Sequence, residues 1–261
     1  MMLHQRTGPA NPANLPSARF FADVGITANM RVLDVGCGNG DLSRMIAELV
    51  GPDGEVVGID RSEAALAAAR GMTPTAEAAP ISYQAVDLSG EFPDLGEFDA
   101  IVGRRVLMYL PDAAATLARL AKLSRRGTLM AFQEHARADL PGGPDELPVH
   151  RQCYDMMWDT VAAEQGDVTL GYRLANLMRE AGFAIEQARS EGILFHPWEE
   201  SFLPTLARLM LPRMIERGVV RDGEIDLDGL ARAIDDERRA VKGTIFWDLA
   251  FLVSGRFQSA E

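Results

Sequence analysis

Short apolar runs alternate with amphipathic stretches along most of the chain. Apolar runs at 31–36, 55–59, 81–86, 98–102, 128–132 and 183–188 predict strands, and a last strand is predicted at about 249–253. Helical spacing of apolar residues predicts helices at 15–24, 41–50, 62–70, 111–123 and 171–181. Strands that alternate with helices in this way form βαβ units with a mostly parallel sheet. We therefore expect an α/β fold.

Two longer stretches interrupt the alternation. Residues 136–170 begin with a Pro- and Gly-rich segment and continue with helical spacing, and residues 192–243 are mostly helical in pattern. The expected domains are an N-terminal arm and lid helix (1–24), a cofactor-binding core (25–135), an insertion (136–170), a continuation of the core (171–191), a helical cap (192–243) and the final strand of the core (244–261). Both insertions follow strands at the carboxyl edge of the sheet, where such folds bind ligands, so we expect them to form a lid.

Composition narrows the class of protein. The 261 residues include 38 acidic and 26 basic side chains, and the net charge of −12 argues against a nucleic-acid partner. No apolar run reaches the ~18 residues that a membrane span needs, and the N-terminus lacks the pattern of a secretory signal. Cys37 and Cys153 cannot form a disulfide framework, and no cysteine–histidine cluster suggests a metal site. We expect a cytoplasmic protein without a bound metal.

The most informative segment is a glycine-rich turn after the first predicted strand. Gly36, Gly38 and Gly40 alternate with other residues in the stretch 32–40, where an apolar strand passes into a helix. Glycine lets a backbone approach a ligand closely. The dinucleotide fingerprint needs a further glycine beneath the pyrophosphate, but that position is Asp41, whose charge repels a phosphate. The turn therefore favours a ligand without phosphates and argues against an NAD-dependent oxidoreductase.

Acidic residues end the next two predicted strands. Asp60 lies 20 residues beyond Gly40, at the place where a carboxylate accepts hydrogen bonds from both ribose hydroxyls. Asp87 ends the third strand, where it can accept a hydrogen bond from an adenine amino group, and Leu88 can cover the ring. Acids at successive strand ends suit a neutral adenosine that carries a cationic sulfonium.

The glycine turn, the two acids and the strand at 98–102 together resemble the class I S-adenosylmethionine-dependent methyltransferases, over about residues 20–135. The chain is most similar to small-molecule enzymes of the ubiquinone/menaquinone-like or natural-product type. The resemblance implies a Rossmann-like sheet of seven strands with the last strand antiparallel, S-adenosylmethionine as methyl donor and S-adenosylhomocysteine as product. The cofactor-binding residues that it implies are Asp34, Gly36, Gly38, Asn39, Gly40, Asp60, Arg61, Asp87, Leu88 and Arg104.

Methyl transfer from a sulfonium needs a general base only when the acceptor carries a proton on the attacking atom. His135, which follows the fifth strand, is the first candidate, and His150 and Glu134 are the next; Tyr154 and His196 are further alternatives. The loop at 103–106 lacks the Asn/Asp-Pro-Pro-aromatic motif of enzymes that methylate amino groups of adenine or glutamine. It also lacks the carboxylate with which catechol-type enzymes hold magnesium.

The sequence thus predicts transfer of a methyl group to an O, N or C atom of a small, partly apolar acceptor, in secondary metabolism. Two other readings stay open. A protein of the same fold can bind S-adenosylmethionine and catalyse another step, such as a cyclisation, or it can act as a nucleoside-sensing module. The sequence leaves the acceptor undefined, and it is compatible with a monomer or a homodimer.

Overall fold

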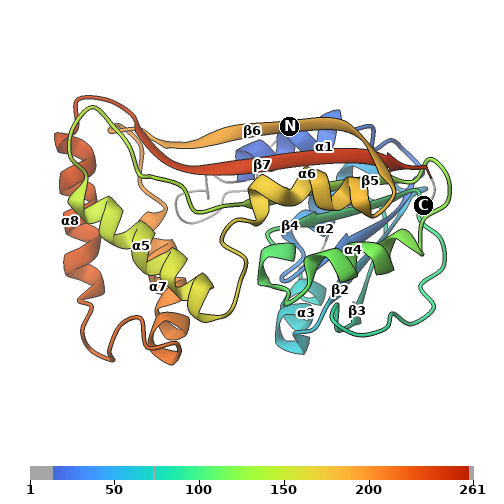
Figure 1. Ribbon diagram of the computed structural model, residues 1–261, viewed down its shortest axis with the longest axis horizontal. Coiled ribbons are helices and arrows are strands. Elements are labelled where there is room, and N and C mark those ends of the chain that lie inside the picture. The colour runs from blue at the N-terminus through green and yellow to red at the C-terminus, as the bar shows by residue number, and fades with distance from the viewer. Residues whose placement is uncertain (1–13, 73, 259–261) are drawn as a thin grey trace. The chain divides into compact units, whose positions relative to one another are not determined.

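The computed structural model describes residues 14–72 and 74–258, and its backbone forms two compact units (Figure 1). The sheet unit contains residues 17–135, 169–190 and the segment from 251 onward. The helical unit contains residues 136–168 and 191–250, and residues 14–16 group with it. Residues 1–13 of the predicted N-terminal arm lie outside the described residues.

A seven-stranded sheet has the order β3-β2-β1-β4-β5-β7-β6. The strands are β1 (Arg31–Val35), β2 (Glu55–Asp60), β3 (Ile81–Ala85), β4 (Ala100–Arg104), β5 (Leu129–His135), β6 (Phe183–Phe195) and β7 (Ile245–Phe257). The pairs from β3 across to β5 are parallel and the last strand is antiparallel, which confirms the predicted Rossmann-like sheet. Because β1 pairs with both β2 and β4, the strand order reverses at β1, and ligands bind at such a switch point.

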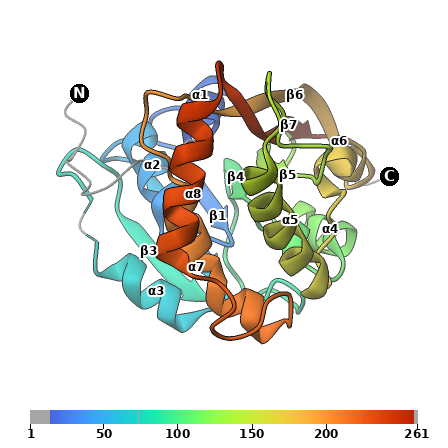
Figure 2. The same cartoon turned by 90° about the vertical axis from the view of Figure 1, so that its left-hand side faces the viewer.

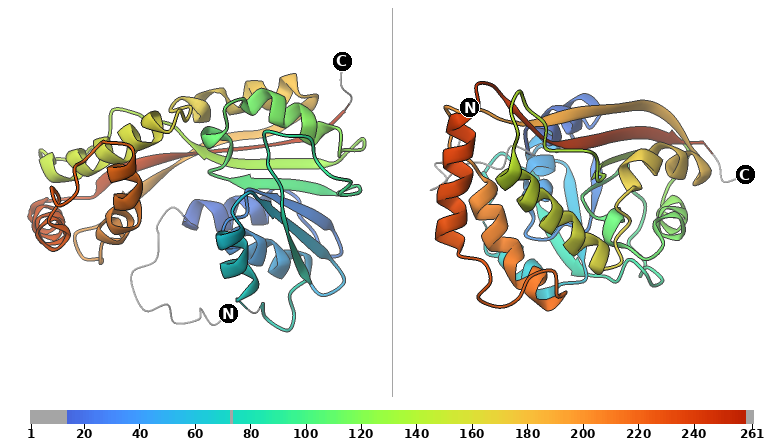
Figure 3. Two further views of the ribbon diagram at one scale, coloured as in Figure 1. Left: turned by 90° about the horizontal axis from the view of Figure 1, so that it is seen from below. Right: turned by 60° about the vertical axis from the view of Figure 1, so that its left-hand side comes forward.

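Helices cover both faces of the sheet within the sheet unit. They are α1 (Asn14–Asp23), α2 (Asp41–Val50), α3 (Glu63–Arg70), α4 (Ala113–Ala121) and α6 (Leu170–Glu180), with a short 3₁₀ helix η1 (Leu107–Tyr109) after β4. Figure 3 (left) shows α2 and α3 on one face and α4 and α6 on the other. Ser62 caps α3 by accepting the Ala65 amide with its side chain.

Some predicted elements differ from the structure at their ends. β6 runs to Phe195 and β7 spans Ile245–Phe257, so both strands are longer than their apolar patterns indicated. The side chains of β6 alternate between exposed and half-buried, which is typical of a strand with one solvated face, and such a strand carries few apolar residues. The helix predicted at 111–123 begins at Ala113, since Asp112 caps it with its carboxylate.

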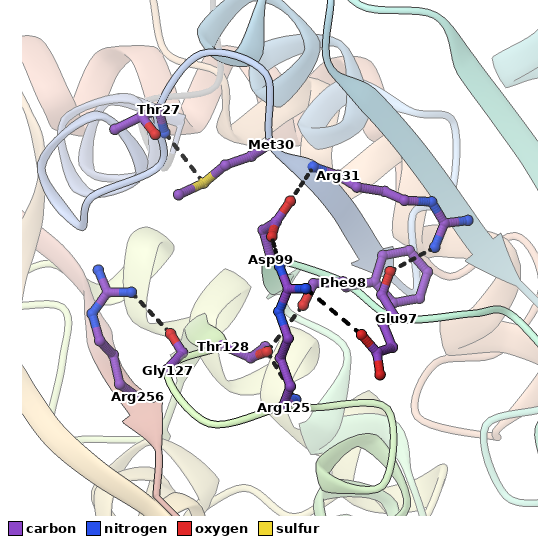
Figure 4. A network of polar contacts seen from close by, with 10 residues as sticks. All are labelled: Thr27, Met30, Arg31, Glu97, Phe98, Asp99, Arg125, Gly127, Thr128 and Arg256. Carbon is purple, nitrogen blue, oxygen red and sulfur yellow. Dashed lines mark hydrogen bonds and ion pairs between the residues drawn. The ribbon is translucent and has the colours of Figure 1, made fainter.

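A polar network joins the amino ends of the central strands (Figure 4). Asp99 Oδ2 accepts the Arg31 amide at 2.9 Å, and the other Asp99 oxygen pairs with Arg125. Thr128 Oγ1 donates to the Phe98 carbonyl at 3.0 Å, and the Arg31 guanidinium lies 4.3 Å from the centre of the Phe98 ring. These contacts connect β1, β4 and β5 at the edge opposite their carboxyl ends.

The helical unit is built on α5 (Pro148–Ala163), α7 (Leu203–Glu216) and α8 (Leu227–Ala240). Each of these helices contacts the other two, and Figure 2 shows them side by side. Cys153, Met157, Met210, Met214 and Ile234 are buried in the unit, so much of the Met-rich pattern in the insertions serves a core. Within residues 14–72 and 74–258, no helix has the length and apolarity that a membrane span requires. The predicted lid role of the insertions stays a prediction.

Candidate functional site

The glycine turn connects β1 to α2 and is held against β2. The amides of Gly36 and Cys37 both donate to the Ile59 carbonyl, at 2.8 and 3.0 Å. Gly36, Gly38 and Gly40 have φ of +66°, +52° and +76°, which favour glycine. These torsions explain why the sequence places a glycine at every second position of the turn.

The three glycines differ in what lies beside them. A Cβ at Gly36 would lie 2.2 Å from Val106 Cγ2, and one at Gly40 would lie 2.3 Å from Tyr83 Oη. Among the described residues, 14–72 and 74–258, a Cβ at Gly38 would meet nothing within 4 Å. Gly36 and Gly40 therefore allow protein side chains to pack against the turn. Gly38 leaves open space beside the backbone, as a ligand that approaches it closely requires.

Asp60 ends β2 and lies directly beside this turn. Its Oδ2 accepts the Gly38 amide at 3.0 Å, and its Oδ1 accepts the Ser62 amide at 2.8 Å. Each carboxylate oxygen has a second lone pair, so the half-buried carboxylate can still accept hydrogen bonds from a ligand. The structure thus brings together the predicted ribose acid and the open glycine.

Asp34 lies on β1 with its carboxyl group fully buried. Its Oδ2 accepts the Ser43 hydroxyl at 2.5 Å, and its Oδ1 has no hydrogen-bond partner among the residues that the structure describes. Burial raises the pKa of Asp34 from 3.8 to about 7, although the Ser43 hydrogen bond and the charge of Arg104 act in the opposite direction. Asp34 therefore fixes α2 to β1 and does not face solvent.

The third predicted acid is at the end of β3. The Val86 amide donates to the Asp60 carbonyl at 3.0 Å, which places Asp87 beside the end of β2. Asp87 is exposed and accepts the Ser89 amide at 2.9 Å, whereas the Leu88 side chain is buried. Asn39 and Arg61, which were predicted to bind the cofactor, are also exposed.

Arg104 ends β4 and contacts the first helix. It donates to Ser17 Oγ at 3.3 Å, and Ser17 Oγ donates to Gln133 Oε1 on β5 at 2.6 Å. Ser17 therefore connects α1 to the carboxyl ends of β4 and β5. Sequence reasoning did not identify Ser17 or Gln133, because a polar residue gives no local sign of a partner 116 positions away.

Two candidate bases are neighbours on β5. His135 is buried, and its Nε2 lies 3.5 Å from Gln133 Nε2. Glu134 points to the opposite face, where its Oε1 accepts the amides of Val106 and Leu107 at 3.0 and 2.8 Å. Burial raises the pKa of Glu134 from 4.5 to about 7, while these amides and the charge of Arg105 lower it.

The remaining candidates lie in the helical unit. His150 is fully buried, with Nδ1 2.6 Å from Glu237 Oε2, and its Nε2 has no hydrogen-bond partner in the described ranges 14–72 and 74–258. Burial lowers the pKa of His150, which favours a neutral ring whose Nδ1–H donates to the carboxylate. Phe195 and Trp247 lie beside the ring, with centroids 6.2 and 6.3 Å away.

Glu237 was not identified from the sequence, although its carboxylate also accepts the amides of Val149 and His150. Tyr154 accepts the Ala138 amide through its hydroxyl, and His196 Nδ1 lies 2.9 Å from Thr244 Oγ1. In the part of the chain that the structure describes, no group of three or more His, Cys, Asp or Glu side chains is arranged to hold a metal ion.

Comparison with known proteins identifies the family. Residues 26–182, which are more than half of the chain, match the methyltransferase domain family. The chain belongs to this family. The resemblance to class I S-adenosylmethionine-dependent small-molecule methyltransferases is confirmed.

Two curated relatives have names that specify an acceptor. The trans-aconitate 2-methyltransferase of Methylobacterium radiotolerans is 32% identical over 174 residues, which are 64% of this chain and 60% of that protein. The 2-phytyl-1,4-naphtoquinone methyltransferase of Synechococcus elongatus is 33% identical over 153 residues, 58% of this chain and 64% of that protein. The match thus spans less than two thirds of the relatives' own length.

Solved structures share the fold at low identity. The crystal structure of a putative methyltransferase from Bacillus halodurans aligns with a TM-score of 0.60, covering 95% of this chain and all of that one, at 15% identity. At this identity the likeness supports the fold of the methyltransferase and not its acceptor.

Proposed function

We propose that this methyltransferase transfers a methyl group from S-adenosylmethionine to an O, N or C atom of a small, partly apolar acceptor. The observation that carries the proposal is the open space beside Gly38, next to the Asp60 carboxylate. The relatives named for trans-aconitate and for a phytyl naphthoquinone support a small organic acceptor. Their names do not restrict the reaction to secondary metabolism, so the proposal extends to primary metabolism.

The residues present fit an adenosine ligand without phosphates. We assign Asp60 to the ribose hydroxyls, Asp87 to the adenine amino group and Leu88 to the face of the ring. The backbone at Gly36, Gly38 and Gly40 forms the floor of the site. Asn39 and Arg61 contribute its rim, and Arg104 pairs with the carboxylate of the methionyl group. When bound, S-adenosylmethionine supplies a methyl group already activated by its positive sulfur.

For acceptors that carry a proton on the attacking atom, we propose His135 or His150 as the general base. His135 lies at the carboxyl end of β5. His150 has its Nδ1 oriented by Glu237 and an unpaired Nε2, an arrangement that leaves a ring nitrogen able to accept a proton. Glu134 is a weaker candidate, because its Oε1 already accepts two backbone amides.

Calorimetric titration with S-adenosylhomocysteine tests the cofactor site. We expect Gly38→Ala to weaken binding at least tenfold, since the new methyl group occupies the space that the ligand needs. Gly127→Ala is the matched control: Gly127 also has a positive φ, +89°, with nothing within 4 Å of its Cβ, but it lies at the amino edge of the sheet. Equal affinities of the two variants would contradict the assignment of the turn.

Asp60→Ala should weaken binding by ~1.5–3 kcal/mol, the range for hydrogen bonds to a charged group. A panel of acceptors then separates methyl transfer from the two other readings. Release of S-adenosylhomocysteine with any acceptor supports methyl transfer. Tight nucleoside binding without such release, over phenols, organic acids and quinols, would favour a non-methylating enzyme or a sensor.

A further inference from the structure

The loop after β4 is held in place by one buried carboxylate. Glu134 is fully buried near the end of β5, and its Oε1 accepts the backbone amides of both Val106 and Leu107. These amides belong to the turn that leads into η1. Glu134 Oε2 is also buried and has no hydrogen-bond partner. Within the described part of the chain, the hydrogen bonds of the Glu134 side chain therefore all go to this loop.

The same loop packs against the glycine turn. A Cβ on Gly36 would lie 2.2 Å from Val106 Cγ2 and 2.8 Å from Val106 Cβ, so the Val106 side chain occupies the position that any larger residue at 36 would need. The backbone of Val106 is held by Glu134 and its side chain is in contact with Gly36. This gives a continuous path from β5, through the loop after β4, to the proposed cofactor turn.

We propose that Glu134 is a positioning residue, and that its ionised form seats the loop at 104–109 against the glycine turn in the geometry that binds the cofactor. The inference rests on the proposed cofactor site and assigns to it a pH-dependent regulation. Charged acceptors make stronger hydrogen bonds than neutral ones, so protonation of Glu134 weakens its hold on the two amides. Protonation of Oε2 would also place an O–H group at a buried oxygen that has no hydrogen-bond partner among the described residues.

The ionisation falls in an accessible pH range, since burial raises the pKa of Glu134 to about 7. Arg105, next to Val106, is the charged group that acts on Glu134, and its positive charge favours the carboxylate. Other ionisable side chains lie on β5 itself and on the elements that pair with or contact it. They are His135 on β5, Arg104 on β4, Tyr109 in η1, Tyr172, Arg173, Arg179 and Glu180 on α6, Arg19 and Asp23 on α1, and Asp248 and Arg256 on β7.

Titration with S-adenosylhomocysteine between about pH 6 and about pH 8.5 tests the inference. This ligand lacks the sulfonium charge, so direct attraction between Glu134 and positive sulfur does not contribute. We expect the affinity of the wild-type protein to rise about tenfold over this range, the ratio between a charge-assisted and a neutral hydrogen bond. Glu134→Gln should match the wild type near pH 6 and bind about tenfold more weakly near pH 8.5.

Two control variants isolate the effect. Asp34 also has a pKa raised to about 7, so Asp34→Asn is titrated in parallel and should keep the part of the pH dependence that Glu134 causes. Glu48→Gln makes the same chemical change at an exposed position of α2 and should behave as the wild type. If Glu134→Gln keeps the wild-type affinity and pH profile, the inference is wrong while the cofactor site stands.

Hydrogen exchange of the wild-type protein gives a second, independent measurement. The protection factors of the Val106 and Leu107 amides should rise with pH as Glu134 ionises, relative to those of amides within β4. Constant protection factors overturn the inference even if Glu134→Gln does not fold. Absence of S-adenosylhomocysteine binding at every pH contradicts the proposed function instead, and the exchange data then still decide whether Glu134 positions the loop.

Discussion

Replacement of Asp34 by asparagine should change how the stability of the protein depends on pH. The Asp34 carboxyl is fully buried, and its pKa is raised from 3.8 to about 7 chiefly by burial. Below pH 3.8 both the folded and the unfolded chain are protonated at this group. Between pH 3.8 and about 7 the unfolded chain ionises first, so the free energy of unfolding falls as the pH rises. Above about pH 7 the folded chain is ionised as well, and the free energy of unfolding falls no further because of this group.

The raised pKa corresponds to a loss of up to about 4 kcal/mol between pH 4 and pH 8, at about 1.4 kcal/mol for each unit. Asparagine cannot ionise, so Asp34→Asn removes this pH-dependent loss. The asparagine oxygen can still accept the Ser43 hydroxyl, but its amide nitrogen would occupy the position of the unpartnered Oδ1. That buried donor costs about 1–3 kcal/mol at every pH. The variant is thus expected to be less stable than the wild type near pH 4 and to gain on it as the pH rises.

Urea denaturation followed by far-ultraviolet circular dichroism at several pH values measures this difference. Tryptophan fluorescence is the wrong probe, because Trp158, Trp198 and Trp247 all lie in the helical unit. Glu134 titrates in both proteins and cancels in the comparison. A difference in unfolding free energy that stays constant from about pH 4 to about pH 8 would refute the reasoning, because it would mean that Asp34 does not remain protonated in the folded chain.

Two further substitutions test contacts outside the cofactor turn. Glu237→Gln should destabilise the helical unit by about 2 kcal/mol, since the Glu237 carboxylate accepts hydrogen bonds from two backbone amides and from the His150 ring. Urea denaturation followed by tryptophan fluorescence measures the loss, and Asp236→Asn at an exposed position is the control. Asp99→Asn should cost about 1 kcal/mol, because it weakens the pair with Arg125 at the amino edge and keeps an acceptor for the Arg31 amide. Affinity for S-adenosylhomocysteine should be unchanged in Asp99→Asn, and a loss of more than about threefold would contradict the separation of the two sheet edges.

The sequence predicts the central part of the fold well, because β1, β2, β4 and β5 are buried and carry continuous apolar runs. The sequence does not show that β6 continues beyond residue 188. Its middle residues alternate between exposed and half-buried positions and include several charged side chains, so they form no apolar run. Cys37, within the glycine turn, is buried as well. The local pattern of apolar residues is therefore sufficient to predict a strand where burial alone determines which residues it contains.

Long-range polar partners are beyond such reasoning. Glu237 is 87 positions from His150, and Ser17 is 116 positions from Gln133, so nothing local in the sequence indicates that these residues meet. The same holds for Glu134, whose amide partners lie 28 and 27 positions earlier. From the sequence, a carboxylate after a strand is a candidate base. Only the fold shows that one of its oxygens is already engaged by two backbone amides.

The carboxyl groups at this edge of the sheet differ in their surroundings, and the difference divides their tasks. Asp60 is half-buried and accepts one amide on each oxygen, so it has lone pairs left for a ligand. Asp34 and Glu134 are fully buried, each has one oxygen without a partner, and each has a pKa raised to about 7. A carboxyl that must contact an incoming nucleoside needs the first environment. A carboxyl that sets the position of a neighbouring loop or helix can instead be fully buried. Its charge then depends on pH near neutrality. The site therefore combines one acid suited to binding with two buried acids whose hydrogen bonds hold α2 and the loop after β4.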